Sequence, residues 1–359
     1  MMLRWTVIVP VAAFLVLAFA WGRPAVGLLM ALVALALVGA VIAAVHHAEI
    51  VAHRVGEPFG TLILAIAVTV IEVGLIVILM SAGGAGAESL ARDTVFSAFM
   101  IVCNGVMGLC LLVGALKHHV LEFRVDGVTA ALATLSAVAT LALVLPNFTL
   151  ATPGPTYSAA QLAFAGIASL VLYGVFVFMQ TVRHRDYFLP VQAGGEGRPS
   201  EEHADPPTRR TALISLGLML ICLVSVVGLA KTVSPAIEES IAAIGAPRTT
   251  VGVTIALLVL LPETVAAVRA AARNRVQNSF NLALGSALAS IGLTIPAIAV
   301  VSLLTGDSLA LGLGPLQMVL LALTVVITTL TVAPGRATLM QGTVHLVLFG
   351  AFLFLAVSP

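Results

Sequence analysis

The sequence predicts an all-α, polytopic membrane protein with about eleven transmembrane helices, for three reasons. Hydrophobic residues make up 60% of the 359 residues, whereas charged residues make up only 9%. Soluble domains are roughly 45–50% apolar and about 25% charged, so a water-soluble globule is excluded. The apolar residues also gather in runs of about 20, the length of helix that crosses a hydrocarbon core of about 30 Å. The formal net charge of +1, without a basic cluster, excludes a nucleic-acid binder.

Polar turns separate the apolar runs along the chain. The first run admits a second interpretation, since Arg4, an apolar stretch and Ala18-Phe19-Ala20 resemble a signal peptide with its cleavage site. We expect this run to be retained as a helix, because the chain re-enters the membrane soon after Pro24. The eleven expected spans are 5–21, 24–45, 59–80, 94–116, 127–145, 159–182, 211–230, 249–268, 279–304, 315–332 and 338–357.

The Lys and Arg residues predict the orientation, because the cytoplasmic loops of membrane proteins are enriched in both. When the N-terminus is placed in the cytoplasm, all but four of the 17 Lys and Arg residues fall on the cytoplasmic side. We therefore expect a cytoplasmic N-terminus and an external C-terminus. The four residues on the outer side are Arg23, Arg92, Lys231 and Arg248.

A polar segment rich in Gly, Pro and acidic residues, 183–210, divides the chain and is interpreted as a flexible cytoplasmic linker. We expect an extra N-terminal helix (1–23), a first repeat with spans 2–6 (24–182), this linker, and a second repeat with spans 7–11 (211–359). Because each repeat has an odd number of spans, the second would be inverted relative to the first. Inverted repeats with a site near the bilayer midplane are typical of secondary transporters.

One glutamate lies deep in an apolar span of each half, and these two residues are the strongest functional signal. Gly60 to Glu72 reads GTLILAIAVTVIE, and Gly252 to Glu263 reads GVTIALLVLLPE. A carboxylate at this depth costs roughly 2.5 kcal/mol or more, and the sequence has no Lys or Arg deep in a span to neutralise it. Two permanently protonated acids that hydrogen-bond between helices explain the paired positions less well. We therefore expect Glu72 and Glu263 to bind a metal cation and to couple its transport to protons.

Two carboxylates neutralise one Ca²⁺ or two protons, and mutually exclusive binding combined with alternating access predicts antiport. Oxygen ligands suit hard cations such as Ca²⁺, Na⁺ and K⁺. Neighbouring side chains add candidate oxygens, although interhelical hydrogen bonding explains each of them equally well, and a proline would free a backbone carbonyl. The supporting residues are Thr69, Asn104, Pro262, Asn281, Gly285 and Ser286, and the peripheral acidic residues are Glu49 and Glu239.

Other chemistry-bearing residues carry weaker signals. The sequence contains no nucleophile elbow, Walker motif or dinucleotide fingerprint, so we expect neither an enzyme nor a cofactor. The three cysteines lie in apolar runs without metal-type spacing and are interpreted as small buried hydrophobes. His46 and His47 lack the spacing of a zinc site and are expected to be solvated at the membrane boundary. His345, in the last span, is interpreted as a packed polar residue.

A family resemblance is carried by three segments: GEPFGTLILAIAVTVIEVGLI (56–76), ARDTVFSAFMIVCNGVMGLCLLVGALKHH (91–119) and LPETVAAVRAAARNRVQNSFNLALGSALASIGLTIPA (261–297). They are similar to the ChaA-type bacterial calcium/proton antiporters of the cation/calcium exchanger superfamily. The resemblance implies an inner-membrane protein that exports Ca²⁺, with Na⁺ and K⁺ as further candidate ions, in exchange for protons. It places Glu72 and Glu263 on the central acidic positions of the two repeats. Thr264 departs from the vacuolar members, which carry more acids and a histidine around the second glutamate.

Two other functions stay open on the sequence alone. A Na⁺/H⁺ or K⁺/H⁺ antiporter would use the same two glutamates, whereas a passive cation channel belongs to a different class. A channel usually builds its pore from oligomeric symmetry, and this chain carries its symmetry internally, which favours the antiporter. The expected partners are inorganic cations, protons and membrane lipid, without nucleic acid, and a homo-oligomer is left open.

Overall fold

The computed structural model of the chain describes residues 5–23, 25–56, 59–81, 87–189, 207–243, 245, 247, 249–306 and 309–358. Within these residues, ten helices are long and apolar enough to cross a membrane. A further apolar helix at the start of the chain is shorter, with 16 residues. The prediction of an all-α membrane fold with about eleven spans is therefore confirmed.

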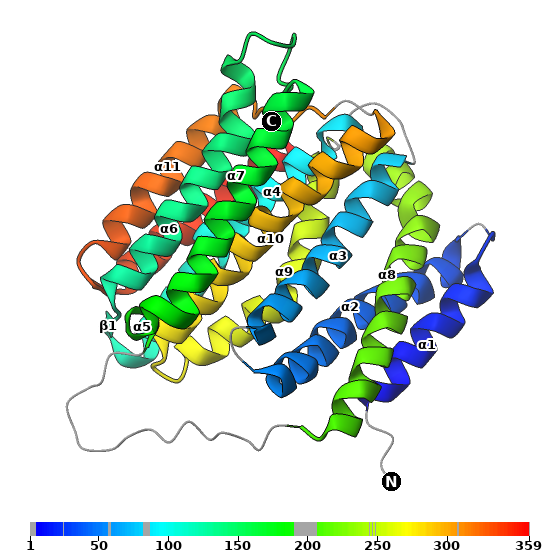
Figure 1. Ribbon diagram of the computed structural model, residues 1–359, viewed down its shortest axis with the longest axis horizontal. Helices are drawn as coiled ribbons and strands as arrows, with labels where there is room; N and C mark the ends of the chain where they lie inside the picture. The colour runs from blue at the N-terminus through cyan, green and yellow to red at the C-terminus, as the bar shows by residue number, and fades with distance from the viewer. Residues whose placement is uncertain are drawn as a thin grey trace. The chain divides into compact units, whose positions relative to one another are not determined.

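The helices follow the order of the apolar runs, and short 3-10 and π-helical turns extend several of them (Figure 1). Before the linker lie α1 (Trp5–Ala20), α2 (Gly27–Val55), α3 (Phe59–Ser81), η1 (Ala87–Ser89), α4 (Leu90–Met100), η2 (Ile101–Val106), α5 (Met107–His118), β1 (Leu121–Glu122), α6 (Val125–Ala139), η3 (Thr140–Val144), η4 (Leu145–Phe148), α7 (Ala159–Phe178), η5 (Met179–Arg183) and η6 (Arg185–Phe188). After it lie α8 (Arg209–Ala243), α9 (Thr249–Ala271), α10 (Val276–Thr305), α11 (Pro315–Val332), β2 (Arg336–Ala337) and α12 (Leu339–Val357).

Two helices extend well beyond the apolar runs that predict them. α2 continues to Val55, so His46 and Glu49 lie on a helix and not in a polar turn. α8 runs for 35 residues to Ala243, through Pro235. A helix that ended at the apolar boundary would leave its last four carbonyl groups in need of other partners. Continuing the helix moves these open carbonyls past the apolar run into the polar segment that follows.

Contacts between Cα atoms divide the chain into two compact units. Unit 1 contains Met1–Leu79 and Val191–Glu239, and unit 2 contains Met80–Pro190 and Ser240–Pro359. Each unit draws residues from both sides of the linker, so the packing units and the expected repeats divide the chain in different ways. The division into two repeats stays a prediction, and most of the linker itself lies outside the described residues.

Unit 1 is formed by α1, α2, α3 and α8. α1 packs along α2, where His47 Nε2 lies 2.7 Å from the carbonyl oxygen of Thr6 and the rings of Trp5 and His46 are 5.3 Å apart. A small buried cluster joins α2, α3 and α8; its members are Ala48, Ala67 and Met219. This apolar packing fixes α3, the helix that carries Glu72, to two neighbours.

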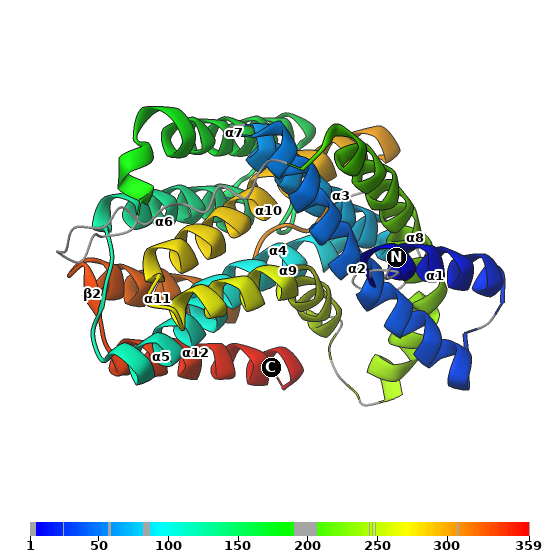
Figure 2. The same cartoon turned by 90° about the horizontal axis from the view of Figure 1, so that it is seen from below.

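Unit 2 is built around α10, which packs against α6, α7 and α9 (Figure 1). α4 packs on α9, and α12 packs along α5 and η2 (Figure 2). On the way from α5 to α6, β1 pairs with β2 in antiparallel register, with Leu121 opposite Ala337. Helices from both sides of the linker therefore interlock in this unit, and α9, which carries Glu263, is enclosed by α4, α5 and α10.

Glycine permits two close helix approaches in unit 2. A Cβ atom on Gly252 of α9 would lie 2.8 Å from the backbone carbon of Asp93 and the backbone nitrogen of Thr94 in α4. A Cβ atom on Gly342 of α12 would lie 2.7 Å from the backbone nitrogen of Leu112 in α5. Lipid is as apolar as leucine, so helices in a membrane associate through such close packing and not through hydrophobic burial.

We expect Gly252→Ala to lower the melting temperature of the purified protein in detergent. Overpacking against backbone atoms costs about 1–3 kcal/mol, which outweighs the helix propensity of about 0.8–1 kcal/mol that alanine adds. Gly174→Ala in α7 is the matched control, because a Cβ atom there would meet no atom within 4 Å. If both variants melted at the same temperature, the close approach of α4 and α9 would be contradicted.

Candidate functional site

Three carboxylates are buried among the described residues, and two of them are the glutamates that the sequence singles out. The exposed fraction of the residue is 1% for Glu72 and 8% for Glu263, and the third, Asp93, is 2% exposed. Among the same described residues, no Lys or Arg is buried. Because an ionised carboxylate is costly in apolar surroundings, each of the three positions needs a proton, a cation or hydrogen-bond donors.

Glu72 lies in unit 1, in the middle of α3. The neighbouring residues Ile71 and Leu75 are buried, with exposed fractions of 1% and 2%. Thr69, three residues before Glu72 and hence on the same face of the helix, donates its hydroxyl to the carbonyl of Ala65 at 2.8 Å. The hydroxyl oxygen of Thr69 keeps its capacity to accept a hydrogen bond or to bind a cation.

Glu263 lies in unit 2, in α9. This helix continues through Pro262 without interruption. Proline has no N–H group, so the carbonyl of Leu258, four residues earlier, lacks its usual helical donor. The backbone carbonyl that we expect a proline to free is therefore that of Leu258, about one turn before Glu263.

Asn104 is fully buried in the π-turn η2 of unit 2. Its amide nitrogen donates to the Thr324 hydroxyl at 2.8 Å, and its amide oxygen lies 3.2 Å from His345 Nδ1. Asn104 therefore joins η2 to α11 and α12. An amide oxygen has two lone pairs, so one of them stays available after the contact with His345.

Three further candidates lie on α10, at two different depths. Near the start of the helix, Asn281 Nδ2 donates to the carbonyl of Phe188 at 2.5 Å, and Asn281 Oδ1 accepts from Gln277 at 2.9 Å. Gly285 and Ser286 follow one turn later and are partly exposed. A Cβ atom on Gly285 would meet no atom within 4 Å. Asn281 thus joins α10 to η6, whereas Gly285 borders open space.

The two peripheral acids differ from the buried carboxylates. Glu49 on α2 and Glu239 on α8 are both exposed. Within the part of the chain that the structure describes, no group of three or more His, Cys, Asp or Glu side chains is placed to hold a metal ion.

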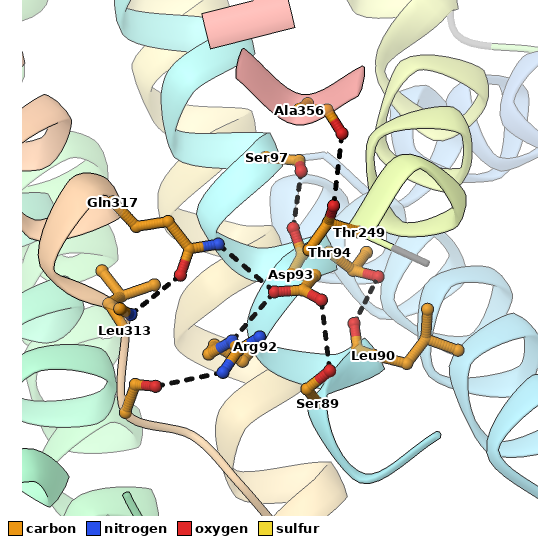
Figure 3. A network of polar contacts seen from close by, with 12 residues as sticks. Ser89, Leu90, Arg92, Asp93, Thr94, Ser97, Thr249, Leu313, Gln317 and Ala356 are labelled. Atoms are coloured by element: carbon orange, nitrogen blue, oxygen red, sulfur yellow. Dashed lines mark hydrogen bonds and ion pairs between the residues drawn. The ribbon is translucent and has the colours of Figure 1, made fainter. Parts of the chain in front are cut away.

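Asp93, at the start of α4, is the centre of a polar network in unit 2 (Figure 3). Its carboxylate accepts from Arg92 Nε at 2.8 Å, from the Ser89 hydroxyl at 3.2 Å and from Gln317 Nε2 at 3.4 Å. Arg92 also donates to the carbonyl of Gly312 at 3.2 Å. The network ties the first turn of α4 to the start of α11 and to the segment before it.

Sequence reasoning missed Asp93 because it assigned the residue to the polar turn before the fourth span. In the structure α4 begins at Leu90, one turn before the apolar run, and carries Asp93 into the interior. The available signal was the adjacent pair Arg92-Asp93 directly before an apolar run. Opposite charges at such a place can enter the interior as a neutral pair.

The ten long apolar helices among the described residues define a multi-pass membrane protein. The family described as "Sodium/calcium exchanger protein" matches residues 24–182 and again residues 214–358. The chain belongs to this family of exchangers.

Individual relatives cover nearly the whole chain. The putative ionic transporter y4hA of Sinorhizobium fredii is 50% identical over 327 residues, 90% of this chain and 87% of the relative. The sodium-potassium/proton antiporter ChaA of Escherichia coli is 34% identical over 352 residues, 97% of this chain and 94% of the relative. The solved structure of the Ca²⁺/H⁺ antiporter protein YfkE superposes with a TM-score of 0.74 at 15% identity, over 99% of this chain and 100% of that chain. This last likeness shows the fold alone.

The family resemblance that the sequence carries is thereby confirmed. Members of this family are cation exchangers, so the protein is a transporter of inorganic ions and not an enzyme. The transported ions are its substrates, and the family uses no cofactor.

We expect Asp93→Asn to lower the melting temperature in detergent. The substitution leaves the charge of Arg92 without its ion pair at 2.8 Å, and loss of a hydrogen-bonded partner at a buried site costs about 1–3 kcal/mol. Asp126→Asn is the matched control, because Asp126 is also a first-turn aspartate but is exposed. An Asp93 variant as stable as the Asp126 variant would show that the network does not hold α4 and α11 together.

Proposed function

We propose that the protein exchanges Ca²⁺ for protons across a bacterial inner membrane by alternating access, and that both ions compete for Glu72 and Glu263. The observation that supports this most is the burial of one glutamate in each half of the chain, with no buried Lys or Arg among the described residues. A buried carboxylate needs a compensating positive charge, and in an exchanger a proton or a transported cation supplies it. Membership of an exchanger family agrees with this requirement.

The charges of the two glutamates account for the coupling. Two carboxylates carry two negative charges, which one Ca²⁺ or two protons neutralise, and oxygen ligands suit Ca²⁺. Since the cation and the protons exclude each other, Ca²⁺ moves in one direction and protons return in the other. The ligands must be deprotonated to bind a metal ion, so the apparent cation affinity rises with pH.

Oxygen atoms beside each glutamate would complete the coordination. We assign this role to the Thr69 hydroxyl in α3 and to the carbonyl that Pro262 leaves without a donor in α9. Ser286, next to the open space at Gly285, is the candidate on α10. A Ca²⁺ ion takes six to eight oxygen ligands, and backbone carbonyls, hydroxyls and water supplement the carboxylates.

A Na⁺/H⁺ or K⁺/H⁺ antiporter is the second candidate, and one observation favours it. ChaA of Escherichia coli, which is 34% identical to this chain, is named a sodium-potassium/proton antiporter. One monovalent cation neutralises one carboxylate and leaves the other to a proton, so the same two glutamates would serve with a different stoichiometry. The fold is compatible with either ion.

We expect Glu72→Gln and Glu263→Gln each to abolish cation-dependent proton flux in everted membrane vesicles. Glutamine keeps the volume and one carbonyl oxygen but neither ionises nor carries a proton, so a divalent cation keeps an uncompensated charge. Glu122→Gln, at an exposed position of β1, is the matched control and should behave as wild type. Comparing Ca²⁺, Na⁺ and K⁺ in the same vesicles identifies the ion. Wild-type flux in either buried-glutamate variant would end the two-carboxylate mechanism.

The orientation is a separate proposal, with the N-terminus in the cytoplasm and the C-terminus in the periplasm. Cysteine labelling with a membrane-impermeant maleimide in intact cells tests it, and the native cysteines give little background because all three are buried. We expect Leu150→Cys, where the native side chain is fully exposed at 100%, to be labelled from outside. Ser200→Cys, in the linker, should be protected until the cells are opened. The reverse pattern would require the inverted topology.

A further inference from the structure

A group of buried polar side chains joins three elements of unit 2 around Asn104, which lies midway along the helical span Ala87–His118. Its members are Asn104 in η2, Thr324 and Thr331 in α11, and His345 in α12. Their exposed fractions are 0%, 1%, 3% and 0% respectively. Apart from Asn104, a candidate supporting residue of the cation site, the proposed exchange mechanism does not use these residues; the four are called the His345 group.

The hydrogen bonds of the His345 group have one consistent set of directions. The Thr324 hydroxyl lies 3.4 Å from Met100 Sδ and accepts from Asn104 Nδ2 at 2.8 Å. The amide oxygen of Asn104 must then face His345 Nδ1, 3.2 Å away, which makes Nδ1 the protonated ring nitrogen. His345 Nε2 is left to accept from the Thr331 hydroxyl at 3.0 Å. A neutral imidazole therefore satisfies both of its ring nitrogens.

None of these partners of His345 carries a charge. The partners of the ring are the hydroxyl of Thr331 and the amide of Asn104. An imidazolium without a carboxylate beside it is costly in such surroundings. The surroundings favour a ring that orients its neighbours over a ring that takes up and releases protons.

The contacts of His345 fall on the π-turn η2. In a π-turn the backbone bonds run from i to i+5, and such turns are frequent at functional sites. His345 reaches Asn104 in η2. The backbone of α12 at His345 also lies close to the next turn, because a Cβ atom on Gly108 would be 2.9 Å from His345 Cβ. His345 thus holds the side chain of Asn104 where η2 and α5 pack on α12.

Two close approaches place η2 at the depth of Glu263. At one end, a Cβ atom on Gly252 of α9 would lie 2.8 Å from the backbone nitrogen of Thr94. At the other end, a Cβ atom on Gly114 of α5 would lie 3.5 Å from the carbonyl oxygen of Ala271, the last residue of α9. The two long helices therefore run in the same direction. Each residue of a helix advances 1.5 Å, and Asn104 and Glu263 are ten and eleven residues past Thr94 and Gly252. The two side chains belong to the same level of unit 2, and α9 and η2 are in contact.

We propose that His345 is a positioning residue for cation exchange. It acts through Asn104 and holds η2 in place beside α9, at the depth of Glu263. The inference rests on the proposed role of Glu263. In the proposed function Glu263 binds the cation or the proton. His345 keeps the adjacent turn η2, and the amide of Asn104 in it, in one orientation. In metal sites, partners that orient a neighbouring ligand are typically worth about 10–100-fold in affinity or activity.

The test compares two substitutions of His345 in everted vesicles, measured as cation-dependent proton flux with Ca²⁺, Na⁺ and K⁺. Glutamine donates to Asn104 and accepts from Thr331 but does not titrate between pH 5 and 9, whereas leucine does neither. We expect His345→Leu to lose about tenfold or more of the flux and His345→Gln to keep it within about threefold. If His345→Gln were as inactive as His345→Leu, the ring would be a proton carrier and the positioning role would be wrong.

A second pair of variants leaves His345 intact. Thr324→Val keeps the shape but removes the acceptor of Asn104, and should lose most of the flux while the protein stays folded by size-exclusion chromatography. Thr329→Val is the matched control, since its exposed hydroxyl bonds only within its own helix, to Val325 at 2.7 Å. Wild-type flux in both His345→Leu and Thr324→Val would overturn the inference. Flux that survives Glu263→Gln would overturn the proposed function instead, so the two failures are distinguishable.

Discussion

The cost of a carboxylate in apolar surroundings is the constraint on which this structure depends. The chain keeps Lys and Arg out of the interior of its described residues, yet buries Glu72 and Glu263 in two different helices. Asp93 has a partner of opposite charge beside it, because the partly exposed Arg92 pairs with its carboxylate at 2.8 Å. The ion pair of Asp93 serves the architecture of unit 2, whereas the proposed function gives Glu72 and Glu263 to the transported ions.

Two sets of specific contacts hold the helices of unit 2 together, one near the start of α4 and one around η2. Near the start of α4, the network of Asp93 and the contact at Gly252 hold this helix to α11 and α9. In the other set, the His345 group holds η2 to α11 and α12. Hydrophobic association is weak between helices in lipid, so such specific contacts decide which helices pair.

The spans of this fold were predictable because lipid makes apolar length a direct signal of structure. Glu72 and Glu263 were recognisable for the same reason, since a lone acid stands out in an apolar run. Asp93 and the extension of α2 to Val55 were not, because the apolar pattern marks where lipid ends and not where a helix ends. The His345 group was beyond reach, because Asn104 and His345 are 241 residues apart and a sequence does not state which helices touch.

The π-turn η2 gives the continuous helix α4–η2–α5 one more residue than its parallel neighbour α9 over the same length. Between the contacts at their ends, one helix has twenty steps from Thr94 to Gly114, and its neighbour has nineteen from Gly252 to Ala271. The wide turn takes up the surplus residue without moving either end. Deleting one residue of the turn other than Asn104 would convert it to a regular helix and keep the contacts at both ends. The same deletion in α9 would rotate everything beyond it by about 100° and turn Glu263 away from its place, so only one of the two helices tolerates a change in length.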